Sequence, residues 1–431
     1  MHNQILQMKT NKLKFWIAGI LLAAGLFTLS VRSNKSPQNL IWSDMDGYYV
    51  YLPAVFIHQG FVREAARDTN YLQVWPGTDK IFTKYTCGVS LLESPFFIVA
   101  HILSEPLGFA PDGHSLIYCY LLMLSAIFCL MAGSVLLWRV CRKYYSDKSV
   151  ILAITCLFFG TNMYYYTIFQ PTMSHIYSFF MYACLLYLTE KIIVERTYNR
   201  SNFALAGLVS GLVILIRPTS AIVLLYPVYR FIKSIDDKPG WFRKNLKYCI
   251  LALLAGMIVF IPQLIYWKHV TGEWFMWSYG EESFKYWKEP KLFRVLFDAW
   301  NGWLLYSPVA AIPLIGLIQE RHRNRHGERA VIFIFALATW LFASWWAWWF
   351  GGAFGHRCYV EYCAFLVLPF SGIIEKAAQN RVRGVLFGAL CVVLVYYSMG
   401  LTYNYRAPWD GPDWTYEKVA GEIERLVHFQ F

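Results

Sequence analysis

Charged residues are scarce in this chain of 431 residues. Asp, Glu, Lys and Arg make up 15% of it, whereas 57% of the residues are hydrophobic and 19% are aromatic. A soluble globular domain carries about 25% charged residues, so this shortage excludes an ordinary soluble protein and indicates an integral membrane protein. The net charge of +12 does not indicate a nucleic-acid partner, because the basic residues form short patches between apolar stretches rather than one continuous face.

The sequence also lacks paired cysteines, periodic repeats and low-complexity tracts. None of its ten cysteines forms a CxxC pair, and most lie inside apolar stretches, where a free cysteine behaves as a small hydrophobe. Neither a zinc site nor a disulfide scaffold is indicated. Without repeats or composition shifts, we expect residues 1–431 to form a single integral membrane domain.

Long apolar stretches dominate what is present. Each is read as one membrane-spanning helix, with boundaries uncertain by a few residues, which predicts an all-α polytopic protein of about 11 transmembrane helices. The first stretch resembles the apolar region of a signal peptide, but it is too long and has no cleavage site, so we expect a retained anchor. The stretches are 15–32, 114–138, 150–168, 175–194, 203–216, 219–233, 248–267, 304–319, 330–348, 359–374 and 384–402.

The basic residues predict how the chain is oriented in the membrane. If the N-terminus is cytoplasmic, the inner segments hold 23 of the 39 basic residues, as the positive-inside rule requires. The outer face then carries a long first loop (33–113), the segments 169–174, 268–303 and 349–357, and a C-terminal tail (402–431). We expect a multi-pass protein of the bacterial inner (cell) membrane, with its active site facing the periplasm or exterior.

One further apolar stretch, 89–103, is not counted as a span. It is about 15 residues long and contains Glu93, Pro95 and His101, which favours an interfacial or re-entrant helix. Counting it as a span would also invert every later loop. Juxtamembrane helices are therefore expected in the first outer loop.

Two acids lie directly after the first apolar stretch, at the predicted outer face. Asp44 or Asp46 could act as a general base that accepts a proton from an incoming hydroxyl. Alternatively, both could cap the helix that follows, since Asp is favoured at a helix N-terminus. Tyr48 and Tyr49 begin the adjoining aromatic run, and we predict that they bind substrate.

Three separated cations lie near the same face: Lys84, Arg217 (followed by Pro218) and Arg357. We predict that they bind the donor phosphate together with Tyr85, which follows Lys84. Together they would suit a lipid phosphate, because a guanidinium contacts two oxygens at once and a lysine acts as a point charge. The alternative is that each extends to the lipid headgroups or pairs with a nearby acid.

Two histidines are weaker candidates. His175, in a short outer connection, could hydrogen-bond substrate or simply pack, and His356 precedes the third cation. The tryptophan-rich segment 345–349 could stack on a sugar, although a girdle of tryptophans at a membrane interface is the usual role. Asp44 and Asp46 with His58 could bind a divalent metal, but oxygen ligands nearby are few, so we expect no cofactor and keep a divalent metal as the alternative.

Several of these segments resemble the GT-C glycosyltransferases, closest to the branch of protein mannosyltransferases and lipid A aminoarabinose transferases. They are the acids past the first helix, the Lys84-Tyr85-Thr86-Cys87-Gly88 segment, the Arg217-Pro218 break and the Gly355-His356-Arg357-Cys358-Tyr359 segment. Thr86 and Cys87 replace two prolines of the family's pattern. Gln170 and His175 occupy the second outer loop, where the family often has another acid.

The resemblance implies an inverting transferase that moves a sugar from a polyprenyl-phosphate carrier to an acceptor hydroxyl of a lipid, glycan or protein in cell-envelope glycan biosynthesis. It implies Asp44 as base, with Asp46 as helper or alternate, and a phosphate held by the cations. Two other classes stay open. A transporter or flippase of lipid-linked sugars should have ionisable residues in midspan and paired halves, and a non-catalytic assembly partner should expose a docking surface.

Overall fold

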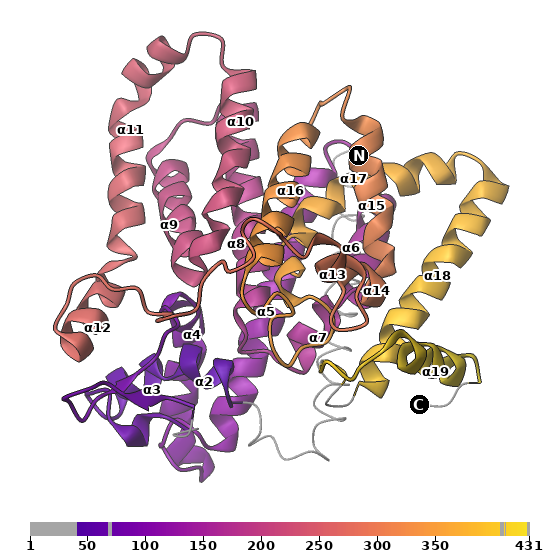
Figure 1. The fold of residues 1–431 in the computed structure, drawn as a ribbon. Coiled ribbons are helices and arrows are strands. Elements are labelled where there is room, and N and C mark those ends of the chain that lie inside the picture. Colours follow the sequence, from indigo (N-terminus) through magenta and orange to yellow (C-terminus); the bar gives the residue numbers. More distant parts are fainter. Residues whose placement is uncertain (1–40, 68–70, 406–408, 410, 429–431) are drawn as a thin grey trace.

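The computed structural model describes residues 41–67, 71–405, 409 and 411–428 (Figure 1). It is 69% helix and 1% strand, which confirms the mostly helical prediction. The predicted anchor helix at 15–32 and the lysines before it lie outside the described residues.

Short elements of the first outer loop precede the long helices. They are α2 (Asp44–Tyr49), α3 (Tyr51–Phe56) and an antiparallel pair of strands, β1 (Gln73–Val74) and β2 (Ile81–Phe82), in which Gln73 lies opposite Phe82. The helices that follow are α4 (Gly88–Ser104), α5 (Leu116–Cys141), α6 (Asp147–Gly160), α7 (Met163–Ile168), α8 (Ser174–Thr189), α9 (Arg200–Ile216), α10 (Leu225–Ser234), α11 (Lys238–Ile258), α12 (Ile261–Thr271), α13 (Leu292–Phe297), α14 (Trp303–Tyr306), α15 (Ala311–Glu320), α16 (Glu328–Ser344), α17 (Cys363–Ala378), α18 (Arg381–Asn404) and α19 (Tyr416–Val427).

Five helical segments among the described residues are long and apolar enough to cross a membrane, so the predicted count of about 11 is not confirmed. They are Gly88–Leu107, Leu116–Cys141, Ser174–Val194, Lys238–Thr271 and Arg381–Asn404. Other predicted spans are interrupted. The stretch 150–168 breaks between α6 and α7, where the Asn162 N–H donates to Ser307 Oγ (3.0 Å), and the stretch 304–319 breaks at Pro308, which has no N–H to donate.

The apolar stretch 89–103, expected to be too short for a span, belongs to a longer helix. Helix α4 continues through a 3₁₀ turn to Leu107, and together they give 20 residues of sufficient hydropathy to span a membrane. The apolar run alone underestimated the helix, because the helical segment begins at Gly88 and extends past residue 103 to Leu107, and Pro95 inside it does not end it. Length therefore does not exclude α4 as a span. In Figure 1 it lies beside α2 and α3, below the lower end of α9.

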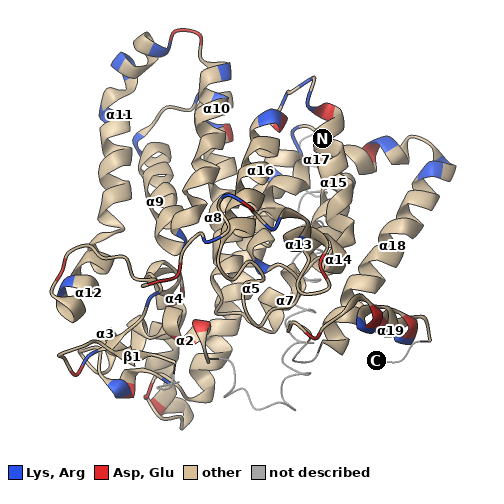
Figure 2. Cartoon of the chain, viewed as in Figure 1, with Lys and Arg blue, Asp and Glu red and all other residues tan. Residues whose placement is uncertain are grey.

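Basic residues gather at one end of the helices. In Figure 2, Lys and Arg cluster where α10 meets α11, where α15 meets α16 and where α17 meets α18, all at the top of the view. These are loops that the sequence assigns to the inner side. Their common location agrees with that assignment, and the side of the membrane that they face stays a prediction.

Helix α8 forms the centre of the fold and packs against both α5 and α9. Nearly all of its side chains are buried, including Tyr177, Phe179 and Tyr182. The start of α8 and the end of α9 lie at the end of the bundle opposite the basic loops. The elements that hold the candidate site meet there.

Candidate active site

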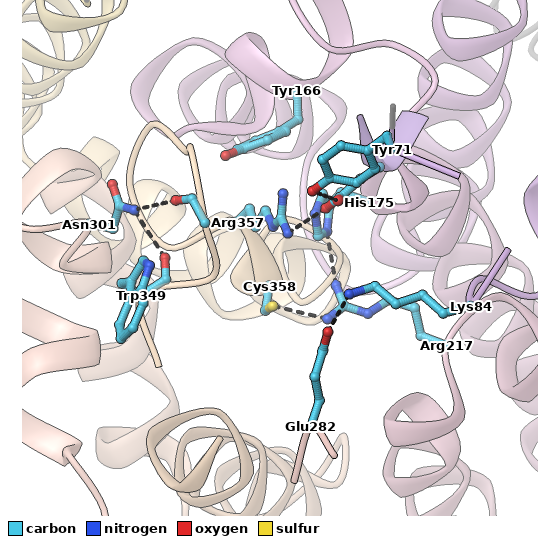
Figure 3. Close-up of polar contacts among 12 residues, drawn as sticks. Tyr71, Lys84, Tyr166, His175, Arg217, Glu282, Asn301, Trp349, Arg357 and Cys358 are labelled. Carbon is cyan, nitrogen blue, oxygen red and sulfur yellow. Dashed lines mark hydrogen bonds and ion pairs between the residues drawn. The ribbon is translucent and has the colours of Figure 1, made fainter. Parts of the chain in front are cut away.

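An acid from α2 and an arginine from the segment before α17 form an ion pair. Asp44 Oδ2 lies 2.8 Å from Arg357 Nη2, and the two side chains are only 14% and 16% exposed. The Tyr71 hydroxyl donates to Asp44 Oδ1 at 3.3 Å (Figure 3). Helix α2 begins after Ser43, whose side chain makes no capping hydrogen bond. The Asp44 oxygens thus contact side chains across the site, an arrangement that the capping interpretation does not account for.

Neighbouring groups keep Asp44 ionised. Burial alone would raise the pKa of Asp44, but the positive charge of Arg357, a hydrogen bond from Tyr85 and the charge of Lys84 together outweigh it. The pKa of Asp44 therefore lies below its ordinary value. Conversely, burial and the nearby Asp44 charge raise the pKa of Tyr85 well above its usual range, so this phenol stays protonated and can donate.

The loop that carries Arg357 is held from a distant segment. Asn301 adopts a left-handed backbone conformation (φ 64°), and its Nδ2 donates to the carbonyls of Trp349 (3.0 Å) and Gly351 (3.2 Å). Gly351 also has positive φ (73°), and a Cβ there would lie 3.8 Å from Arg357 Nη2. A glycine at this position lets the backbone turn beside the guanidinium.

His356 supports this loop. Its side chain is fully buried, and its Nε2 lies 3.0 Å from the carbonyl of Trp348, to which it donates. Burial, with Arg217 and Arg357 nearby, lowers the pKa of His356 to about 3, so the imidazole is neutral. The proposed contact of His356 with substrate remains untested, and the contact present in the structure is with the loop backbone.

The second arginine, Arg217, forms an ion pair with a different acid, Glu361. Arg217 follows the last residue of α9 in an extended conformation (φ −149°, ψ 112°), as expected before proline. Its Nη1 lies 3.1 Å from Glu361 Oε1, and its Nη2 donates to Cys358 Sγ at 3.0 Å. His175, at the start of α8, contacts the other oxygen of this carboxylate, with Nδ1 3.0 Å from Glu361 Oε2. The same Nδ1 lies 3.1 Å from Arg217 Nη1 (Figure 3).

A glycine allows the first outer loop to reach this region. A Cβ on Gly88 would lie 2.7 Å from the backbone nitrogen of Ile216, so only glycine permits this approach of α4 to the end of α9. The contact brings the Lys84-to-Gly88 segment beside Arg217. Lys84 itself pairs with Glu282 of the 268–303 loop, Nζ to Oε1 at 2.5 Å, and the Ser278 hydroxyl donates to the Lys84 carbonyl at 2.7 Å.

Most of the residues singled out from the sequence are thus brought together. Tyr48 joins them through its ring, whose centroid lies 4.4 Å from that of Tyr85. Tyr49 points elsewhere: its hydroxyl donates to the Gly113 carbonyl and its ring packs near Phe97. Asp46 is fully buried, and residues two apart on a helix face different directions, so it does not share the position of Asp44.

Sequence reasoning missed three members of the group. Glu361 was absorbed into the apolar stretch 359–374, although an acid inside such a stretch is itself a signal of function. Glu282 and Tyr71 lie in loops and carry no comparable signal. Among the residues that the structure describes, no cluster of three or more His, Cys, Asp or Glu side chains could hold a metal ion.

About one third of the chain is similar to a known family of glycosyltransferases. Residues 120–267 match the sequence model of a family described as dolichyl-phosphate-mannose-protein mannosyltransferase, which confirms the resemblance noted from the sequence. The matched segment contains His175 and Arg217 but neither Asp44 nor Arg357. A search of curated proteins finds no match to the chain.

Proposed function

We propose that this protein transfers a sugar from a polyprenyl-phosphate carrier to an acceptor hydroxyl at the outer face of a bacterial cell membrane. The observation that carries the proposal is the pairing of Asp44 with Arg357, at 2.8 Å, beside two further cations. Such a group combines a proton acceptor with positive charge for a phosphate. The family match adds support, since the family's description names a lipid-phosphate sugar donor and a mannosyl transfer.

The reaction is a single displacement at the anomeric carbon of the sugar. The acceptor oxygen forms a bond to this carbon as the bond to the carrier's phosphate oxygen breaks, and the electron pair of that bond leaves with the phosphate. Asp44 accepts the acceptor's proton, and the configuration at the anomeric carbon is inverted. Arg357, Arg217 and Lys84 stabilise the negative charge that develops on the departing phosphate. No nucleotide is needed.

Binding of the donor changes the environment of the base. In the absence of substrate, Arg357 serves as the counter-ion of Asp44. A donor phosphate that contacts the same guanidinium competes with this pairing and adds negative charge next to the carboxylate. Both effects raise the pKa of Asp44, so the carboxylate becomes a stronger base only when the donor is in place.

The acids that pair with these cations differ in how buried they are. Glu361, the partner of Arg217, is 1% exposed and fixed by His175, whereas Glu282, the partner of Lys84, lies on a loop with 26% of its side chain exposed. A phosphate can displace Glu282 more readily than Glu361. Lys84 is therefore the cation whose own acid is most easily exchanged for the donor.

The test uses the purified full chain in lipid nanodiscs and a panel of radiolabelled polyprenyl-phosphate hexoses and pentoses. Lipid, glycan and peptide acceptors are offered in separate reactions, and Arg323→Lys, a change at an exposed side chain of the opposite end, serves as the matched control. We expect label in one acceptor class with inverted anomeric configuration. Movement of the labelled donor across sealed vesicles without any glycosylated product would instead support a flippase.

A further inference from the structure

A buried carboxylate that no step above uses joins two side chains of the site. Glu361 is 1% exposed, as is His175, and one carboxylate oxygen contacts His175 Nδ1 while the other contacts Arg217 Nη1. Arg217 Nη1 also lies 3.1 Å from His175 Nδ1. Three groups from α8, the end of α9 and the segment before α17 therefore converge within hydrogen-bonding distance.

The position of the imidazole proton follows from these contacts. If Nδ1 carried no hydrogen, its lone pair would face Glu361 Oε2 at 3.0 Å, and two acceptors at that distance repel each other. Arg217 Nη1 would then donate to Nδ1 at 3.1 Å, but the buried Oε2 would receive no hydrogen bond from either side chain. With a hydrogen on Nδ1, the imidazole donates to Oε2 and Arg217 donates to Oε1, so both oxygens of the buried carboxylate are paired. Glu361 thus selects the tautomer of His175 in which Nδ1 is protonated.

The other ring nitrogen is left as a buried acceptor. His175 Nε2 has no hydrogen-bond partner among the described residues. Two further polar atoms of the connection that leads into α8, Gln170 Oε1 and Thr172 Oγ1, are also buried without a partner there. Buried polar groups are normally paired, so the unpaired Nε2 of a side chain that contacts Arg217 indicates a ligand that donates a hydrogen bond, such as a hydroxyl group.

We propose that His175 Nε2 accepts a hydrogen bond from a hydroxyl of the transferred sugar, and that Glu361 is the positioning residue that keeps this nitrogen free of a proton. The identity of the ligand in this inference rests on the proposed transfer function. The predicted tautomer of His175 does not depend on that function, because it can be measured without a sugar donor.

The first test is solid-state ¹⁵N NMR of histidine-labelled full-length protein in lipid, with the His175 signals identified by their loss in His175→Gln. We expect a neutral ring protonated at Nδ1. His356 supplies an internal reference of the opposite kind, because its Nε2 donates to the Trp348 carbonyl. A His175 ring protonated at Nε2 in the wild-type protein would overturn the proposal.

The second test removes the charge of Glu361 with little change of shape. In Glu361→Gln the amide can donate to Nδ1, so we expect part of the His175 signal to shift to the Nε2-protonated form while the His356 signal stays unchanged and reports an intact fold. An unchanged His175 tautomer would show that Glu361 does not position the ring. Since the wild-type spectrum is decisive by itself, a variant that fails to fold leaves the proposal testable.

The third test concerns the sugar. Carboxylates that orient a metal-binding histidine account for roughly 10–100-fold in activity or affinity, and we expect Glu361→Gln to lower kcat/KM by a factor of this order. For the wild type, one monodeoxy donor should be a poorer substrate than the donor that carries all of its hydroxyl groups. For His175→Phe, these two donors should be used equally well. If no monodeoxy donor shows this difference, the hydroxyl contact is wrong. If no donor at all is used while the tautomer is as expected, the transfer function fails instead.

Discussion

Replacement of Asp44 by Asn tests the proposed base most directly. The variant keeps the size of the side chain and one oxygen, which can accept from Arg357, while an NH2 group takes the place of the oxygen that accepts from Tyr71. It cannot take up the acceptor's proton. Loss of a general base lowers rates by roughly 10²–10⁴-fold, which corresponds to about 2.7–5.5 kcal/mol in the activation free energy. We expect kcat to fall by this factor.

The structure also predicts an effect on stability. Unit charges 2.8 Å apart attract by about 6 kcal/mol at an effective dielectric constant of 20, most of which is offset by desolvation. Removing one partner of a fully buried pair costs about 3–5 kcal/mol. Here both side chains keep some exposure, and Asn retains a hydrogen bond to Arg357, so we expect a loss of about 1–3 kcal/mol in the free energy of unfolding.

Donor binding separates these two effects. Without the Asp44 charge, Arg357 is free to contact the donor phosphate, so the KM for the donor should not rise. Transfer of labelled sugar and thermal unfolding are measured on the same preparations. Asp298→Asn is the matched control, because Asp298 also pairs with an arginine, Arg294, but in another loop. Activity of Asp44→Asn within about threefold of the wild type would refute the assignment of Asp44 as base.

Three further outcomes follow from the same arrangement. Arg217→Lys should lower transfer at least tenfold, because a point charge cannot reproduce bidentate contact, whereas Arg323→Lys should be neutral; equal losses would indicate damage to folding. Arg357 helps to hold the pKa of Asp44 below its ordinary value, so wild-type kcat/KM should not decline until the pH falls below about 4. In Arg357→Gln this decline should begin at higher pH. If kcat/KM of the two proteins declines at the same acidic pH, Arg357 does not act on the base. In a background without reactive native cysteines, a cysteine at Ser283 should react with an impermeant reagent from outside and one at Arg323 should not, and the reverse result would invert the topology.

The fold was predictable where hydrophobicity alone decides it. The ten apolar stretches from residue 114 onward all coincide with helical segments, because burial or contact with lipid rewards an apolar helix whatever its neighbours are. Their interruptions were not predictable. The break before α7 depends on a hydrogen bond from Asn162 to Ser307, and such a partner cannot be read from local sequence.

The sequence singled out several side chains of the candidate site, but it indicated neither Glu361, Glu282 and Tyr71 nor the pairings. Asp44, Arg217 and Arg357 stand out because charges beside apolar stretches are rare and usually functional. That Asp44 pairs with Arg357, and Arg217 with Glu361, depends on how distant helices pack. The position of Tyr49 away from the site shows the same limit, since an adjacent aromatic side chain on a short helix can face another cluster.

The distance along the chain between Asp44 and Arg357 determines when, during synthesis of the protein, the candidate site can form. The two residues are 313 positions apart, and at a synthesis rate of 5–20 residues per second the arginine emerges about 15–60 s after the acid. Glu361, which holds Arg217, is made later still. A nascent or prematurely terminated chain that ends before these residues therefore has the acid and the first cations without their partners. If the protein acts as proposed, competence for transfer arises only once most of the helices have been inserted, and incomplete chains in the membrane do not consume the carrier.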